Sequence, residues 1–331
     1  MKRIVLDDVA PELRARLRTI PRPRFENAIC RRFMRWMNRR SFAPLIEGVN
    51  IETLTGDGVE LRIYRPARRL SQAALLWVHG GGYIVGHPAQ NDGLCAETAS
   101  ELGIAVVAPR YRLAPEHPFP AGLDDCHTAL RWMQSTAARL DIDPARIAVG
   151  GESAGGGLAA ALVQRLHDEY VHDGRNLPAA AQWLFCPMID DRTAANRDLD
   201  AGEHFLWNNT ANAFGWRSYL AQRPGAGSTP AYGAPSRRDD LKGLPPAWLG
   251  TSTLDLFHDE DTLYAERLRA AGVPVDFVDV EAAPHGFHVF AADAPLSRDF
   301  VTQARQWLRD WLIDNQISEN STSGRSSRVP R

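Results

Sequence analysis

The stretch Arg146-Ile147-Ala148-Val149-Gly150-Gly151-Glu152-Ser153-Ala154-Gly155 decides the fold, because it predicts a short buried strand that turns abruptly into a helix. Residues 146–150 are mostly apolar, and residues 154–170 are rich in alanine and leucine, which favour helix. Glycine on both sides of the Glu-Ser-Ala triplet lets the chain close a tight turn. A strand that leads directly into a helix is the unit from which helix-covered parallel sheets are built.

Further strands and helices alternate on both sides of this unit. A hairpin is expected from residues 49–54 and 59–64, which flank Gly56-Asp57-Gly58. The other expected strands are short and apolar: residues 73–78, 104–108, 147–149, 182–185, 247–252 and 275–280. Helices are expected between them, including residues 260–271 and a last amphipathic helix at 297–312. We therefore predict an α/β fold with a mostly parallel, twisted sheet and helices on both faces.

A histidine–glycine run, His79-Gly80-Gly81-Gly82, follows the predicted strand at residues 73–78. Its glycines allow the backbone to approach a ligand closely and to direct N–H groups at it. Gly151 to Gly155 match the pattern Gly-x-Ser-x-Gly, which in α/β-hydrolases places a nucleophilic serine on the turn between a strand and a helix. In that architecture a glycine-rich loop supplies N–H donors to the oxyanion of an acyl-transfer intermediate. The two stretches together predict a serine hydrolase with an α/β-hydrolase fold.

A serine hydroxyl is a weak nucleophile, so the predicted chemistry requires a base and an acid that orients the base. α/β-Hydrolases carry these groups in the order serine, acid, histidine, and Ser153, Asp255 and His285 satisfy that order. Asp255 follows the strand at 247–252, and His285 lies in the loop after the strand at 275–280. Both positions fall at the carboxyl edge of the predicted sheet, where such folds place catalytic groups.

Other titratable residues near these motifs are weaker candidates. Asp259 and Asp261 are the alternatives for the acid, and Asp259 is interpreted as a carboxylate at the start of a helix. His79 precedes the glycines and is expected to shape their loop. Glu152 is expected to hold neighbouring loops rather than to act chemically. Cys186 follows an apolar strand and is interpreted as a small buried hydrophobe.

The chain resembles the hormone-sensitive-lipase-like family of α/β-hydrolase esterases over residues 49–312, with the motifs in the family's order. Beyond the two glycine-containing stretches, the resemblance rests on Tyr111-Arg112-Leu113-Ala114-Pro115-Glu116, Phe119-Pro120-Ala121, Asp124-Asp125, Gly243-Leu244-Pro245-Pro246-Ala247-Trp248, Asp255-Leu256-Phe257-His258-Asp259-Glu260 and His285-Gly286-Phe287. The resemblance implies that Gly81, Gly82 and Ala154 donate the N–H groups of an oxyanion hole. It also implies that Asp255 is the acid, since that residue is the first aspartate of the family's D-x-x-x-D pattern. The chain departs from the family at Glu152, where many members carry aspartate.

Five segments are expected along the chain. The resemblance implies a helical cap over the active site, formed by residues 1–48 and by an insertion at 189–240. The hydrolase core would then comprise residues 49–188 and 241–315, and residues 316–331 are a Ser/Arg/Asn-rich tail predicted to be disordered. The aromatic residues of the insertion are expected to form its own small core or to line the acyl pocket. They are Phe205, Trp207, Phe214, Trp216 and Tyr219.

The first segment contains an amphipathic helix. Apolar side chains recur at helical spacing on one face, at Phe25, Ile29, Phe33, Trp36 and Met37. Arginines lie around that face, at positions 31, 32, 35, 39 and 40. We expect the apolar face to pack against the body of the protein and the basic face to be solvated. A helix that lies on a membrane surface is the alternative.

Bulk composition argues against several classes of protein. A net charge of −2 and a sequence pI of about 6.6 do not suggest a nucleic-acid partner. No apolar run approaches the ~18–20 residues of a membrane helix, so stable membrane insertion is not expected. The N-terminus lacks the apolar core of a signal peptide, which predicts a cytoplasmic location. The four cysteines are widely spaced, which predicts neither a metal site nor a disulfide.

These features predict a serine carboxylesterase that needs no cofactor or metal and whose partner is a small-molecule ester. A homodimer is compatible with the sequence. Bulky cap aromatics, Phe33 and Trp36 among them, are expected to limit the acyl slot to roughly two to eight carbons. Two alternatives stay open: a non-catalytic ligand-binding module on the same fold, and an amidase or lactonase that uses the same three residues. The sequence around His285 argues against the first.

Overall fold

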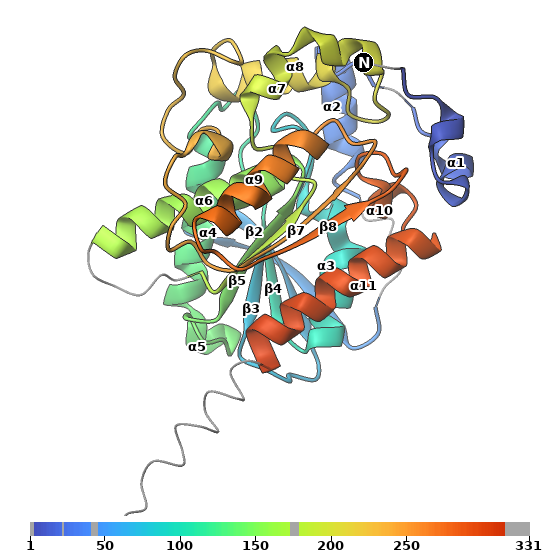
Figure 1. Ribbon diagram of the computed structural model, residues 1–331. Coiled ribbons are helices and arrows are strands. Elements are labelled where there is room, and N and C mark those ends of the chain that lie inside the picture. The colour runs from blue at the N-terminus through green and yellow to red at the C-terminus, as the bar shows by residue number, and fades with distance from the viewer. Residues whose placement is uncertain (1–2, 22, 41–45, 173–178, 315–331) are drawn as a thin grey trace, which may run out of the picture.

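An eight-stranded sheet runs through the part of the chain that the computed structural model describes, residues 3–21, 23–40, 46–172 and 179–314 (Figure 1). The strands are β1 (Val49–Gly56), β2 (Val59–Pro66), β3 (Ala74–Val78), β4 (Ala105–Pro109), β5 (Ile147–Glu152), β6 (Ala181–Phe185), β7 (Ala247–Ser252) and β8 (Val275–Val280). Their order across the sheet is β1-β2-β4-β3-β5-β6-β7-β8. Strands β3 to β8 are parallel, whereas β2 pairs antiparallel with both β1 and β4. The predicted hairpin and the mostly parallel sheet are therefore confirmed.

Helices cover both faces of this sheet (Figure 1). They are α1 (Pro11–Leu17), α2 (Ala28–Met37), α3 (Asp92–Leu102), α4 (Ala121–Ser135), α5 (Ala137–Leu140), α6 (Ala154–His172), α7 (Asp191–Ala195), α8 (Asn209–Leu220), α9 (His258–Ala270), α10 (Phe287–Phe290) and α11 (Pro295–Arg309). The shorter turns are η1 (Leu6–Asp8), η2 (Pro88–Asn91), η3 (Arg197–Gly202), η4 (Pro235–Arg237) and η5 (Asp310–Asp314).

Side chains along β3 alternate between two hydrophobic cores. Leu76 and Val78 belong to the core that includes α4, α6 and α9, whereas Leu75 and Trp77 belong to the core that includes α3 and α11. All four side chains are fully buried. A parallel strand covered on both faces has no solvent side, which explains why this segment is apolar without interruption.

The order of strands reverses next to β3. From β3 the chain passes to β4 on one side, and it then returns to β5 on the other side of β3. In open α/β sheets, ligands bind at the carboxyl ends of the strands beside such a reversal. The His79–Gly82 run follows β3, and Ser153 follows β5. The topology therefore brings the two glycine-containing stretches together at the edge where a site is expected.

Helix α2 is turned the opposite way from the prediction. Arg31 is buried and Arg35 bonds to the body of the protein, whereas Ile29, Phe33 and Trp36 are exposed. The expectation that the apolar face packs inward is therefore wrong for Ile29, Phe33 and Trp36, although Phe25, just before the helix, is buried as predicted. Periodicity identifies the two faces of a helix, but hydrogen bonds from arginine to main-chain carbonyls decide here which face turns inward.

Residues 189–240 form a helical excursion between β6 and β7 that contains α7, η3, α8 and η4. Trp216 and Tyr219 on α8 are buried against Tyr83, so part of the aromatic set forms a core, as expected. The tail at 316–331 lies outside the described residues. Among the helices of the described part, none is long and apolar enough to cross a membrane.

Candidate active site

Ser153 occupies the turn between β5 and α6. Its φ angle is +53°, in the left-handed region that non-glycine residues rarely adopt. The turn is closed tightly, because a Cβ placed on Gly155 would lie 2.1 Å from the carbonyl oxygen of Val78 on the neighbouring strand. Only glycine fits at that position. The strained turn raises the Ser153 hydroxyl above the carboxyl edge of the sheet, as the Gly-x-Ser-x-Gly pattern predicts.

A chain of hydrogen bonds joins the three residues singled out in the sequence. Oγ of Ser153 lies 2.9 Å from Nε2 of His285, and Nδ1 of His285 lies 2.7 Å from Oδ2 of Asp255. All three residues are buried. The second oxygen of Asp255, Oδ1, accepts the backbone N–H of Phe257 at 2.9 Å, which holds the carboxylate in place. Because an ionised carboxylate only accepts hydrogen bonds, Nδ1 carries the proton and Nε2 is free to accept one from the serine.

The alternative acids do not reach this histidine. The side chain of Asp259 is 98% exposed in the first turn of α9 and pairs with His258. Asp261 is buried and accepts a hydrogen bond from the hydroxyl of Thr251 at 2.8 Å. Burial raises the pKa of Asp261 well above its ordinary value. The structure thus brings Asp255, and neither alternative, to His285.

The glycine run after β3 bends over the serine. Gly81 and Gly82 have φ angles of +123° and +57°. A Cβ on Gly82 would lie 1.9 Å from the indole ring of Trp207, so no larger residue fits there. Ala154 is the first residue of α6, where backbone N–H groups lack helical partners. In the described part of the chain, the N–H groups of Gly81, Gly82 and Ala154 donate to no acceptor.

His79 and Tyr111 hold this loop in position through a ring stack and hydrogen bonds. The ring of His79 stacks on Tyr111 with 4.3 Å between the centroids, and Nδ1 of His79 lies 2.8 Å from the carbonyl oxygen of Gly80. The hydroxyl of Tyr111 donates to the carbonyl oxygen of His79 at 2.9 Å. Burial lowers the pKa of His79 to about 4, so the imidazole is neutral near pH 7. His79 shapes the loop, as the sequence suggested.

Glu152 joins the turn at Ser153 to η2 and to α10, as expected of a residue that holds neighbouring segments, although no motif identifies these partners. Its Oε1 accepts hydrogen bonds from Asn91 at 3.0 Å and Gln90 at 3.2 Å, both in η2 after the glycine run. Its Oε2 lies 3.4 Å from Nε2 of His288, which lies in α10 three residues after His285. Burial alone would raise the pKa of Glu152, but His288, Asn91 and Gln90 outweigh it and lower the pKa to about 2. The sequence signal for this contact is a second histidine, His288, three residues after His285.

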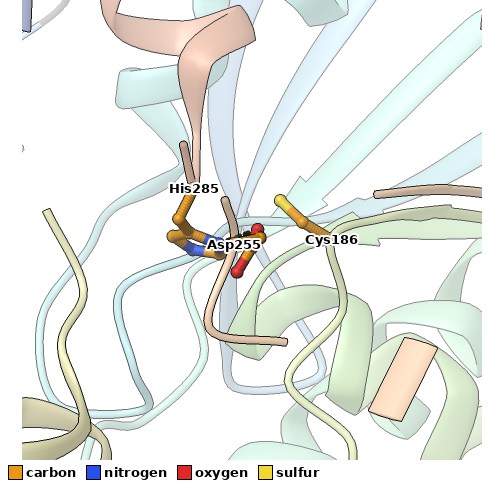
Figure 2. A group of neighbouring side chains, drawn as sticks. All are labelled: Cys186, Asp255 and His285. Atoms are coloured by element: carbon orange, nitrogen blue, oxygen red, sulfur yellow. Dashed lines mark hydrogen bonds and ion pairs between the residues drawn. The ribbon is translucent and has the colours of Figure 1, made fainter. Parts of the chain in front are cut away.

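Cys186 also lies at the site, although its place after an apolar strand predicts only a buried hydrophobic residue. Figure 2 shows it beside Asp255 and His285, and one potential ligand atom from each lies within 4.8 Å of the others. The Nδ1 position that would bind a metal already points at Asp255, so we interpret the pair as sharing a proton rather than an ion. Burial raises the pKa of the Cys186 thiol, which is therefore a neutral wall of the site.

A cavity of about 160 Å³ opens beside Ser153. Phe25, Val85, Leu206 and Trp207 supply its apolar walls. Of the aromatic residues expected to line the acyl pocket, Trp207 lines this cavity. Phe33 and Trp36, by contrast, are exposed on α2 and do not line it.

A larger hollow of about 450 Å³ lies elsewhere, lined by charged side chains that include Arg35, Arg110 and Glu116. It contains none of the three hydrogen-bonded residues. Several of its charges pair with one another, as Arg35 does with Glu116 at 2.8 Å. Size alone does not make it the reactive centre, because the strained serine and its histidine face the smaller cavity.

Comparison with known proteins agrees with this geometry. A family model described as the α/β-hydrolase fold matches residues 75–289. The chain belongs to the α/β-hydrolase family. It is 31% identical over 315 residues to esterase LipI of Mycobacterium tuberculosis, an alignment that covers 93% of this chain and 90% of that protein.

Solved structures of this family superpose on nearly the whole chain. A bacterial heroin esterase shares 36% identity with a TM-score of 0.84, and the match covers 93% of this chain and 99% of that one. An esterase described as belonging to the bacterial hormone-sensitive lipase family shares 28% identity with a TM-score of 0.73, covering 92% and 99% of the two chains. The resemblance to hormone-sensitive-lipase-like esterases is confirmed by these matches.

Proposed function

We propose that this α/β-hydrolase is a serine carboxylesterase that acts on esters of short- to medium-chain acids. The observation that carries the proposal is the continuous hydrogen-bond chain from Ser153 through His285 to Asp255, with distances of 2.9 and 2.7 Å. The same activity stands in the names of the relatives, esterase LipI and the heroin esterase. A non-catalytic module would not need a buried base aligned on a strained serine.

The reaction proceeds in two acyl-transfer steps. Nε2 of His285 takes the hydroxyl proton as Oγ of Ser153 forms a bond to the ester carbonyl carbon. The imidazolium then gives that proton to the leaving alcohol oxygen as the carbon–oxygen bond breaks, which leaves an acyl-enzyme. Water, deprotonated by the same nitrogen, attacks the acyl carbon, and the carboxylic acid leaves as Oγ regains its proton. Asp255 stays ionised and orients the imidazole throughout.

Negative charge that develops on the carbonyl oxygen is stabilised by backbone donors. We assign this oxyanion hole to the N–H groups of Gly81, Gly82 and Ala154, which have no other acceptor among the described residues. Removal of one such donor typically lowers turnover by about 10²–10³.

The size of the cavity supports a short acyl group. Its volume of about 160 Å³ is close to the ~150 Å³ of an apolar protein cavity that holds one benzene molecule. Six carbons or so therefore fill it, within the range of roughly two to eight expected from the cap aromatics. Residues 1–48 and 189–240 are proposed to form the cap, since Phe25 and Trp207 come from these two segments and contact each other.

Initial rates on matched substrates test this function. We expect the chain to hydrolyse p-nitrophenyl butyrate with a kcat/KM well above those for butyryl p-nitroanilide and γ-butyrolactone. Ser153→Ala should lower kcat by about 10⁴–10⁶, whereas Ser252→Ala, at another buried serine on the same sheet edge, should not. Full activity in Ser153→Ala would overturn the proposal. Preference for the anilide or the lactone would leave the roles of Ser153, His285 and Asp255 unchanged but would make the substrate an amide or a lactone.

A further inference from the structure

Helix α2 presents an apolar face to solvent. Ile29, Phe33 and Trp36 are 79%, 55% and 48% exposed, and their spacing places them on one side of the helix. The rings of Phe33 and Trp36 lie 5.9 Å apart. A contiguous exposed apolar patch rimmed by polar residues is typical of an interaction surface.

Hydrogen bonds hold the opposite face of α2 against the protein, so the exposure of Ile29, Phe33 and Trp36 follows from how the helix is attached. Nε and Nη2 of Arg35 donate to the carbonyl oxygens of Ile84 and Ala114 at 2.8 Å. Both terminal nitrogens of Arg35 also bond to Glu116. A roll of the helix that buried the apolar face would break all of these bonds.

Arg31 also turns toward the body of the protein. Its Nη1 donates to the carbonyl oxygens of Phe25 and Glu26 at 2.8 and 2.9 Å. Its guanidinium lies 4.9 Å from the ring centroid of Phe214 on α8, which agrees with the position of α2 beside α8 in Figure 1. Both inward-facing arginines therefore have partners on the side of α2 away from Ile29, Phe33 and Trp36.

Positive charge surrounds the exposed apolar face. Arg24, Arg32, Arg39 and Arg40 are exposed, and the guanidinium of Arg40 lies 4.0 Å from the ring centroid of Trp36. Of the six arginines in residues 23–40, Arg31 and Arg35 face inward, and the four exposed ones are accompanied by a single acidic residue, Glu26. This excess stands out in a chain whose net charge is −2.

We propose that this face of α2, formed by Ile29, Phe33 and Trp36 with the exposed arginines around them, docks on an anionic phospholipid surface. Apolar and aromatic side chains ringed by arginine are the composition of helices that lie in the boundary between lipid headgroups and acyl chains. The arginines would contact phosphate groups while the three apolar side chains enter the boundary.

A second copy of the chain fits this face less well. In a two-fold contact the same face meets itself, so arginines would oppose arginines. The proposal concerns a surface on the outer side of α2, whose apolar side chains do not line the cavity beside Ser153. It is therefore independent of the esterase reaction.

Vesicle sedimentation with the full chain tests the proposal. We expect binding to vesicles of phosphatidylcholine mixed with phosphatidylglycerol, and little binding to phosphatidylcholine alone. The variant Ile29→Ser/Phe33→Ser/Trp36→Ser should bind the mixed vesicles at least about tenfold more weakly. The variant Arg32→Gln/Arg39→Gln/Arg40→Gln should lose about fivefold in affinity for the mixed vesicles per arginine, and its binding should depend less on added salt.

A matched control removes exposed apolar side chains elsewhere. Leu70→Ser/Leu263→Ser changes two residues that are 48% and 47% exposed outside α2 and should bind as the native chain does. Rates on a soluble ester check that every variant is folded. Absence of native binding, or unchanged binding by the triple serine variant, would overturn the proposal. A native dimer that the triple serine variant abolishes would show instead that the face joins two copies of the chain.

Discussion

Replacement of Trp207 by alanine should lengthen the acyl chain that the enzyme prefers. Trp207 is buried, its ring packs 5.1 Å from the ring of Phe25, and both side chains wall the cavity of about 160 Å³ beside Ser153. Each methylene that enters the cavity contributes about 0.8 kcal/mol, which is about fourfold in kcat/KM. From acetate to hexanoate, the four added methylenes should therefore raise kcat/KM by about two orders of magnitude.

The assay is kcat/KM for p-nitrophenyl esters from acetate to palmitate. The native chain should reach its maximum at about six carbons, because the cavity is close in size to one that holds benzene. Trp207→Ala should move the maximum to longer chains. Trp216→Phe is the control, because Trp216 is fully buried on α8 and does not line the cavity. A native maximum at palmitate, or an unchanged profile in Trp207→Ala, would refute this account of the slot.

Three further predictions concern the groups around Ser153. Asp255→Asn should lower kcat by about 10³–10⁴, whereas Asp259→Asn, at an exposed carboxylate, should leave it nearly unchanged; the reverse order would move the acid to Asp259. Gly82→Ala should lower kcat by up to about 10²–10³, because an added Cβ would lie 1.9 Å from Trp207 and the resulting shift would move the Gly82 N–H away from the oxyanion; full activity would contradict the assigned oxyanion hole. Burial lowers the pKa of His79 to about 4 from its usual 6.5, so the unfolded chain binds more protons between these pH values. Acidification across that window should lower the free energy of unfolding by roughly 3 kcal/mol more in the native chain than in His79→Asn, and equal losses in urea titrations would show that His79 does not titrate with folding.

The hydrogen-bonded set of Ser153, His285 and Asp255 could be predicted from the sequence, because each residue follows a strand in a recognisable local pattern. The Gly-x-Ser-x-Gly turn leaves room for one geometry, since a Cβ on Gly155 would strike Val78. The order of β3, β4 and β5 then brings the glycine run beside Ser153. Asp255 and His285 follow β7 and β8 at the same edge of the sheet. Chain order and strand order together were sufficient to predict these neighbours.

The orientation of α2 could not be predicted in the same way. A helical repeat separates apolar from basic residues but does not say which side the body will bind. The sequence predicts Arg35 on the solvated face, because charged side chains usually avoid burial. In the folded chain it satisfies the carbonyl groups of Ile84 and Ala114, which lie far away in sequence. Tertiary partners of this kind leave no periodic signal.

The contacts of Glu152 were missed for a related reason. Glu152 was expected to hold loops, but its partners come from η2 and from α10. Only the folded chain brings these segments to one carboxylate. In the sequence, Trp207 is one of several aromatic residues that could line the cavity. The structure singles it out, because its ring approaches Gly82 closely.

Covalent labelling tests the role of Ser153 most directly. A p-nitrophenyl alkylphosphonate reacts with an activated serine and leaves a stable phosphonyl group on its oxygen. We expect intact-mass spectrometry of the native chain to show one adduct, located by peptide mapping to Ser153. Ser153→Ala, with an unchanged circular dichroism spectrum, should show none. An adduct on another residue of the native chain, or on Ser153→Ala, would contradict the assignment of Ser153 as the nucleophile.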